Sequence, residues 1–224
     1  MTQKAAPGHE LGSLSMSHPT SVVFVVDDDV SVRESLELLI LTAGWRPELF
    51  ASANAFLKHP PTSVPNCLVL DISLPGLNGL DLQKRIVAER PEMPIIFITG
   101  HGVVSQTVQA MKAGAVEFLT KPFTDDVLLK AIGQALERSR SCLARAADIR
   151  GLRDCYASLT PREQQVMKLV VTGLLNKQVG GELEISEITV KAHRGKVMHK
   201  MKADSLADLV KMAARLGLES APKS

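Results

Sequence analysis

Five short apolar runs alternate with helical patterns over roughly 110 residues in the first half of the chain, and this alternation constrains the fold most strongly. The runs are rich in β-branched and aliphatic residues, which favour strands, and the segments between them space their apolar residues three or four apart. The predicted strands cover residues 21–26, 48–50, 67–71, 94–99 and 116–119. Strands and helices in alternation form a parallel sheet with right-handed crossovers, so we expect a doubly wound α/β domain.

The charge of the chain is unevenly distributed. Residues 21–125 contain 12 acidic and 8 basic residues, whereas residues 159–224 contain 7 acidic and 11 basic ones. An acidic first half followed by a basic second half favours a metal- or phosphate-handling site followed by a unit that binds a polyanion.

The compartment is indicated by the cysteines and by the absence of targeting patterns. Cys67, Cys142 and Cys155 form no Cys-x-x-Cys pair, which argues for a reducing compartment and against disulfides or structural zinc. No apolar segment reaches the ~18 residues of a membrane span, and residues 1–20 lack the apolar core of a signal peptide. We therefore predict a cytoplasmic protein with no membrane partner and a disordered tail over residues 1–20, in which Met16 offers an alternative start.

Polar side chains follow four of the five predicted strands. Asp27 and Asp28 come after the first strand, Asp71 ends the third, Thr99 ends the fourth, and Lys121 follows the fifth. Each residue alone has an ordinary explanation as a turn former, a helix cap or a surface side chain. Because the carboxyl ends of parallel strands meet at one edge of a sheet, where such folds bind ligands, we expect these side chains to form one site.

The chemistry of this set indicates a phosphate-handling site. Carboxylates that crowd together need a cation to stay ionised, and hard oxygen ligands without His or Cys select Mg²⁺. A carboxylate can also act as a nucleophile and form an aspartyl phosphate. A hydroxyl and an ammonium would then hydrogen-bond the phosphoryl oxygens.

Four segments at these strand ends resemble the receiver domain of two-component signalling. They are Val26-Asp27-Asp28, Leu70-Asp71 with Pro75, Phe97-Ile98-Thr99-Gly100 and Thr120-Lys121-Pro122-Phe123. The resemblance covers residues 21–135 and implies a flavodoxin-like, five-stranded sheet with the strand order 2-1-3-4-5.

The resemblance also implies roles for single residues. Asp71 would be the phosphoacceptor and, with Asp28 and the backbone carbonyl of Ser73, a ligand of Mg²⁺, while Asp27 would act on the metal through water. Thr99 and Lys121 would bind the phosphoryl group. The Lys121–Pro122 bond would be cis.

A switch follows from the same resemblance. Phosphorylation adds charge and three acceptor oxygens, which would attract Thr99 and Lys121. Phe118 takes the place of the aromatic switch residue, and its inward turn would re-form the surface made by residues 105–113 and 116–119. In the FixJ group this surface dimerises; the candidate contacts here are Val104, Gln109, Lys112 and Glu117.

A helical pattern continues from Asp125 past the expected end of the receiver domain. Its apolar and small residues are spaced three and four apart, at Leu128, Ile132, Ala135, Ser139, Cys142, Ala146 and Ile149. Small and polar members make this a poor coiled coil, and Gly151 interrupts the pattern. For a helical linker over residues 136–156, a solvated connector and a dimer-forming signalling helix both remain open.

The second half of the chain predicts four helices. Thr160, Pro161 and Glu163 form a capping box with proline in the first turn, which marks a helix start. Further helices are expected over residues 176–183, from a cap at Ser186 to about 201, and from a cap at Ser205 to about 216. Two short helices joined by a tight turn, the second of them basic, indicate a helix-turn-helix unit.

Several segments of this half closely resemble the LuxR/NarL-type DNA-binding domain. They are Leu159-Thr160-Pro161-Arg162-Glu163, Asn176-Lys177, Ile185-Ser186 and Thr189-Val190-Lys191-x-His193. The resemblance implies an all-α domain over residues 157–219, followed by a tail of residues 220–224. A receiver followed by this domain is similar to response regulators of the FixJ/NarL type.

The helical period assigns faces to the third of these helices. Val190, Val197 and Met201 share the buried face. Four residues then face the major groove of DNA, namely Lys191, Ala192, Gly195 and His199. Lys191 suits a guanine edge and Ala192 a thymine methyl group, and the cations at the flanks suit phosphates. Those cations are Arg194, Lys196 and Lys200.

Two residues depart from the family pattern. Gly195 stands where the family more usually has a larger side chain. Two reasons remain open: the glycine permits close approach of the backbone to DNA, or it is neutral drift. Glu184 replaces the glycine usual in the turn, where the backbone is often left-handed. Glu184→Gly is therefore expected to stabilise the domain.

These patterns predict a transcription regulator that is gated by phosphorylation. A sensor histidine kinase would phosphorylate Asp71 with Mg²⁺, and the resulting homodimer would bind double-stranded promoter DNA through the helix over residues 187–201; RNA polymerase is a further expected partner. An aspartyl phosphohydrolase of the haloacid-dehalogenase type is an alternative, but it needs an acid where Ser73 stands. A second alternative is a regulator gated by a small ligand, as in quorum sensing. The complete set of Asp71, Thr99 and Lys121 argues against it.

Overall fold

The computed structural model describes residues 21–77, 79–100 and 104–218, apart from the side chains of residues 104–106. The predicted tails, residues 1–20 and 220–224, lie outside the described residues. The chain divides into two compact units, with the division between Leu143 and Ala144.

The first unit contains a five-stranded parallel sheet in the order β2-β1-β3-β4-β5, which confirms the predicted flavodoxin-like arrangement. The strands are β1 (Val22–Val26), β2 (Arg46–Phe50), β3 (Asn66–Asp71), β4 (Ile95–Thr99) and β5 (Glu117–Thr120). Every predicted strand is present, with ends that differ by one or two residues.

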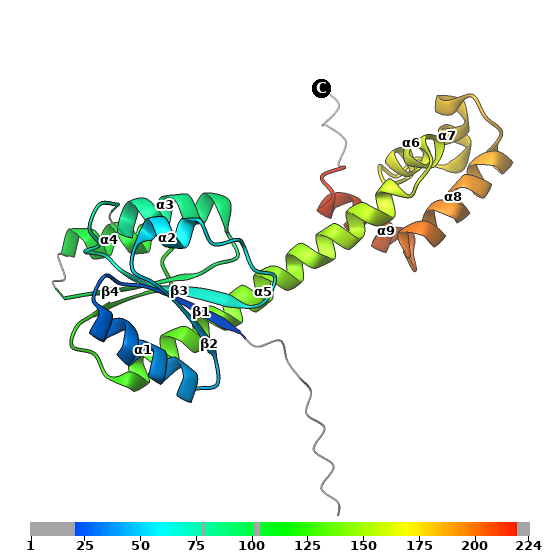
Figure 1. Ribbon diagram of the computed structural model, residues 1–224. Coiled ribbons are helices and arrows are strands. Elements are labelled where there is room, and N and C mark those ends of the chain that lie inside the picture. Colours follow the sequence, from blue (N-terminus) through cyan, green and yellow to red (C-terminus); the bar gives the residue numbers. More distant parts are fainter. Residues whose placement is uncertain (1–20, 78, 101–103, 219–224) are drawn as a thin grey trace, which may run out of the picture. The chain divides into compact units, whose positions relative to one another are not determined.

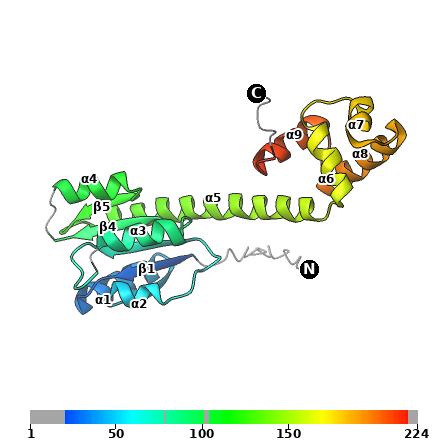
Figure 2. The same ribbon diagram turned by 90° about the horizontal axis from the view of Figure 1, so that it is seen from above.

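Helices cover both faces of this sheet (Figures 1 and 2). Three of them pack on one face, namely α2 (Ala53–Leu57), α3 (Gly79–Glu89) and α4 (Val104–Lys112). The other face is covered by α1 (Val30–Thr42) and the first half of α5 (Asp125–Ala157). Because helices lie on both faces, β1, β3 and β4 are buried throughout, which explains their continuous apolar runs.

Two local features place helix starts at the carboxyl edge of the sheet. The Asp29 side chain accepts hydrogen bonds from the backbone N–H groups of Ser31 and Val32, so α1 begins immediately after the acidic residues. A Cβ atom on Gly79 would lie 2.9 Å from the carbonyl oxygen of Asp71, so this glycine permits α3 to start against the end of β3.

Helix α5 runs without interruption for 33 residues. Its first half has a buried face, made by Leu128, Ala131, Ile132, Ala135, Leu136 and Ser139. Gly151, expected to interrupt the apolar spacing, lies exposed within the helix, which continues through it to Ala157. A glycine inside a helix costs only about 1 kcal/mol relative to alanine, which the hydrogen bonds of a long helix tolerate.

The second unit packs four helices and the end of α5 around one core. The helices are α6 (Pro161–Val170), α7 (Asn176–Leu183), α8 (Glu187–Met201) and α9 (Leu206–Arg215). Thr160 and Glu163 form the predicted capping box, and Ser186 and Ser205 cap α8 and α9 as expected. Among the described residues, no helix combines the length and the apolar character that a membrane span requires.

Candidate functional sites

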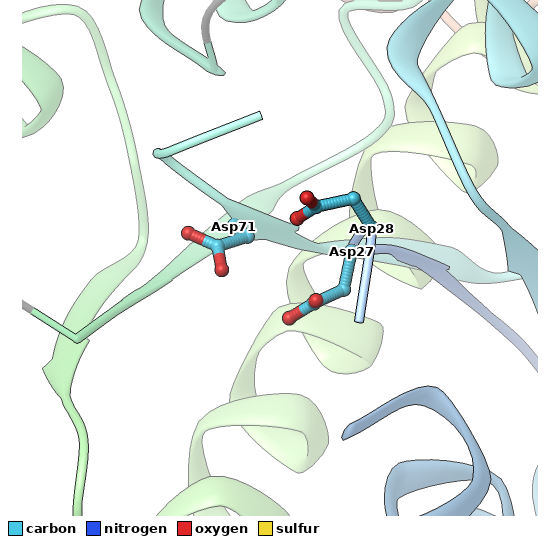
Figure 3. A group of neighbouring side chains, drawn as sticks. All are labelled: Asp27, Asp28 and Asp71. Atoms are coloured by element: carbon cyan, nitrogen blue, oxygen red, sulfur yellow. The ribbon is translucent and has the colours of Figure 1, made fainter. Parts of the chain in front are cut away.

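Three carboxylates gather at the carboxyl ends of β1 and β3 (Figure 3). Asp27, Asp28 and Asp71 each offer an oxygen, and these oxygens all lie within 4.8 Å of one another. Asp27 and Asp71 are buried, whereas Asp28 is exposed. The predicted acidic residues thus form one pocket that is open to solvent on the side of Asp28.

Lys121 places its ammonium between the two buried carboxylates. Its Nζ lies 3.0 Å from Oδ2 of Asp27 and 3.2 Å from Oδ2 of Asp71. Backbone groups hold the other oxygens, since Asp29 N–H donates to Oδ1 of Asp27 and Ser73 N–H donates to Oδ1 of Asp71, both at 2.9 Å. The carboxylates are therefore oriented by contacts at both oxygens.

Charge in the pocket is unbalanced. Burial raises the pKa of Asp27, although the Asp29 N–H and Lys121 oppose this rise. Burial lowers the pKa of Lys121, but its hydrogen bonds and attraction to Asp27 and Asp71 outweigh burial and raise it overall. Three carboxylates outnumber one ammonium by two charges, so the donor set suits a divalent cation with hard oxygen ligands.

Thr99 and Phe118 lie on the neighbouring strands β4 and β5, and Thr99 ends the strand beside that of Asp71. Thr99 is buried at the end of β4, pairs in register with Thr120, and its carbonyl accepts the N–H of Lys121 at 2.7 Å. Phe118, on β5, is half-buried and packs on Phe97 with the ring centroids 6.2 Å apart. The Lys121–Pro122 peptide bond is cis.

Sequence reasoning missed Arg33. This residue of α1 donates from Nη1 to the backbone carbonyl of Asp27 at 2.6 Å and so anchors the end of β1. A single arginine four residues after the acidic run carries no distinctive pattern, so only the packing of α1 reveals this contact.

The second site is the exposed face of α8. Val190, Val197 and Met201 are buried, as predicted. Five residues proposed from the sequence to meet DNA are exposed, namely Lys191, Ala192, Gly195, Lys196 and His199. The structure thus places this face of α8, with the cations Lys191 and Lys196, towards solvent.

The two remaining predicted cations point back into the unit. Arg194 Nη1 lies 3.2 Å from Oδ1 of Asn176 on α7. Lys200 Nζ lies 2.7 Å from Oε2 of the buried Glu163 on α6 and 3.2 Å from the carbonyl oxygen of Ser158. Both cations therefore connect α8 to its neighbours, and sequence reasoning missed this internal role of Glu163 and Lys200.

Comparison with known protein families matches both units. Residues 23–133 match the response regulator receiver domain, and residues 157–213 match the bacterial regulatory proteins of the luxR family.

Individual proteins match over nearly the whole chain. Nodulation protein W of Bradyrhizobium diazoefficiens is 50% identical over 200 residues, which are 89% of this chain and 88% of that protein. Among solved structures, the response regulator StyR shows 46% identity and a TM-score of 0.78, covering 88% of this chain and 99% of that one. Full-length FixJ from B. japonicum shows 42% identity and a TM-score of 0.53, covering 89% and 98%.

Proposed function

Because the chain belongs to the two-component response regulators that join a receiver domain to a LuxR-type DNA-binding domain, we propose that phosphorylation of Asp71 gates its binding to DNA. The family is one of transcription regulators and not a typical enzyme family. Its receiver implies a sensor kinase as partner, and its LuxR-type domain implies DNA. We assign residues 21–135 to the receiver, 136–156 to a helical linker and 157–219 to the DNA-binding domain.

The pocket that contains Asp71 carries this proposal. A carboxylate oxygen of Asp71 attacks the phosphorus of a phosphohistidine on the kinase; a P–O bond forms, the P–N bond breaks, and its electron pair returns to the histidine ring. Asp28, Asp71 and the carbonyl of Ser73 would hold Mg²⁺, with Asp27 acting through water. The metal would supply positive charge that offsets the phosphoryl oxygens.

The charges around Asp71 then change. The phosphoryl group replaces one negative charge with nearly two and adds three acceptor oxygens. Lys121, which already contacts Asp71, and Thr99, at the end of the adjacent strand, would donate to these oxygens. We propose that movement of Thr99 towards the phosphate permits Phe118 to turn inward.

The face formed by α4 and β5 would respond to this movement and pair with a second copy. Val108 and Met111 of α4 are 45% and 43% exposed and offer apolar area for such an interface. Gln109 and Lys112, predicted contacts, are exposed on the same helix, and Glu117 is half-buried. The side chain of Val104, also predicted, lies outside the described residues.

DNA would be read by the exposed face of α8 in each copy. Lys191, Ala192, Gly195 and His199 would face base edges, and Lys196 would contact phosphate. A two-fold dimer suits half-sites about one helical turn apart. RNA polymerase remains a proposed further partner at the promoter.

The two alternatives rank lower on specific grounds. A hydrolase of the haloacid-dehalogenase type needs a general acid where this chain has Ser73. A regulator gated only by a small ligand would not need Asp27, Asp28, Asp71 and Lys121 within contact of one another.

One experiment tests the proposal. The full chain is treated with acetyl phosphate and Mg²⁺, and mass, oligomeric size and affinity for a DNA duplex selected from a random pool are followed together. We expect a gain of one phosphoryl group, a dimer and tighter DNA binding. Asp71→Asn should show none of the three, whereas Asp81→Asn, which changes an exposed acid on α3, should behave as the wild type.

A dimer that forms equally well in Asp71→Asn would contradict the gating. Steady release of phosphate from many equivalents of donor would instead favour the hydrolase alternative.

A further inference from the structure

Ile188 is a large apolar residue that is exposed to solvent. Its side chain is 80% exposed, the highest value among the large apolar residues that the structure describes. It is the second residue of α8, where a β-branched side chain neither caps the helix nor favours it. The folded unit therefore gains little from isoleucine at this position.

The position of Ile188 on α8 is informative. At 100° per residue, Gly195 and His199 lie within about 20° of Ile188 around the helix, and Ala192 within about 40°. The buried Val197 lies about 180° away. Ile188 thus lies at the centre of the exposed face and one turn nearer the N-terminus than Ala192.

The charged residues around Ile188 carry a net positive charge. Lys191 and Lys196 flank the same face and are exposed; Glu187, next to Ile188, pairs with Lys191 at 3.2 Å and leaves Lys196 to favour a polyanion over an apolar protein surface. In the major groove of DNA, the C5 methyl group of thymine is the apolar group among the base edges. The first residues of a recognition helix are the ones that enter the groove and reach those edges.

We propose that Ile188 determines sequence specificity by packing on a thymine methyl group in the major groove. This inference rests on the proposed DNA-binding function. It adds one thymine to the bases that α8 would contact. The recognised chemistry is the methyl group itself, so replacing thymine by deoxyuridine removes the contact and leaves the hydrogen-bonding edge of the base unchanged.

The test combines variants of the protein with variants of the DNA. The full-length wild-type protein, treated with acetyl phosphate and Mg²⁺, first selects a duplex from a random pool, and each thymine of that duplex is then replaced in turn by deoxyuridine. We expect the wild type to lose about fourfold in affinity at one thymine per half-site, the effect of removing one buried methyl group. Ile188→Ala should bind the parent duplex at least fourfold more weakly and be insensitive to deoxyuridine at that thymine.

Two further variants make the result decisive. Val87→Ala, which truncates an exposed β-branched residue of α3, should keep the wild-type affinity and the wild-type sensitivity to deoxyuridine. Ile188→Val should retain part of the affinity and part of the sensitivity to deoxyuridine. It replaces Ile188→Ala in the test if that variant binds too weakly to measure.

Each outcome has a defined meaning. Sensitivity to deoxyuridine that persists at every thymine in both Ile188 variants would overturn the proposal, as would unchanged affinity of Ile188→Ala. The same conclusion follows if no thymine in the selected duplex responds to deoxyuridine. Failure of the wild type to select any duplex would instead contradict the proposed function.

Discussion

Glu163 shows how one buried residue organises the second unit. Hydrogen bonds from the Lys200 ammonium and the Thr160 N–H lower the pKa of Glu163 from 4.5 to about 2. Because the pKa of Glu163 is lower in the folded than in the unfolded state, ionised Glu163 stabilises the fold above about pH 4.5. This contribution is lost as the pH falls towards 2.

Glu163→Gln should therefore lower the stability of the second unit by about 1–3 kcal/mol at pH 7, where a charge-assisted pair is replaced by a neutral one. The difference from the wild type should shrink between pH 5 and pH 2. The measurement is the urea midpoint at several pH values, followed by emission of Tyr156, the single tyrosine, which packs on this core. Glu182→Gln is the exposed control; a pH-independent difference would show that ionisation of Glu163 is irrelevant.

Gly79 matters for a different reason, because the end of β3 leaves no room for a side chain. A methyl group there would also lie 3.0 Å from Cα of Ile72, whose backbone cannot move without moving Asp71. Gly79→Ala should destabilise the first unit by roughly 1–3 kcal/mol and slow phosphorylation from acetyl phosphate.

Mass spectrometry of the phosphorylated chain and the fluorescence of Trp45 during unfolding measure the two effects of Gly79→Ala. Gly133→Ala on α5, where the added carbon would meet nothing within 4 Å outside the backbone of its own helix, is the matched control. Equal phosphorylation rates in both variants would contradict the role assigned to Gly79.

At the scale of elements, the turn between α7 and α8 contains one of the two non-glycine residues of the described chain with a positive φ, the other being Lys202 after α8. Glu184 ends α7 with φ 54° and ψ 42°, a left-handed conformation that side chains disfavour. Gly180, one turn earlier, has no room for a Cβ atom, which would lie 2.8 Å from the carbonyl oxygen of Ile185. The turn therefore depends on one glycine and carries a glutamate where glycine would fit.

Glu184→Gly should stabilise the second unit by about 0.5–1 kcal/mol, since glycine adopts this conformation without the steric cost of a Cβ atom. Glu182→Gly, in the last turn of α7, gains no such relief and should destabilise the unit by up to a similar amount. Thermal unfolding followed by helical circular dichroism measures both. A lower melting temperature for Glu184→Gly would disprove the strain argument.

The elements themselves follow closely from sequence pattern. The five strands are local features that can be read from apolar spacing. The same is true of four helix starts, where one capping side chain accepts a hydrogen bond from a nearby backbone N–H; the caps are Ser52, Thr160, Ser186 and Ser205. The helical pattern past the end of the receiver was also readable, and α5 continues through Gly151, where only the apolar spacing was expected to be interrupted.

At the scale of the whole molecule, a receiver domain and a LuxR-type DNA-binding domain occur in two separate units of one chain. The cations of the second unit divide into two groups. Lys196 is exposed, whereas the Lys200 ammonium is bound to Glu163 and Ser158. The salt dependence of DNA affinity distinguishes these two groups. A lysine that contacts a phosphate releases counterions from DNA and so steepens this dependence, whereas a lysine bound inside the protein does not.

Lys196→Gln should reduce the slope of log affinity against log salt by about one unit. Lys200→Gln should lower the stability of the second unit but leave that slope unchanged. Titration of a selected duplex at several salt concentrations provides the measurement. A reduced slope for Lys200→Gln would restore the phosphate contact first predicted for it.

The order of residues alone determined where strands and helices form, which residues end the strands, and which face of α8 is apolar. These properties repeat with the period of a strand or a helix, so neighbours in the chain are sufficient to define them. Only the tertiary structure decided where the long cations of α8 bind: Arg194 meets Asn176 across 18 positions and Lys200 meets Glu163 across 37. A flexible side chain can reach many partners, and only the packing of distant segments selects one of them.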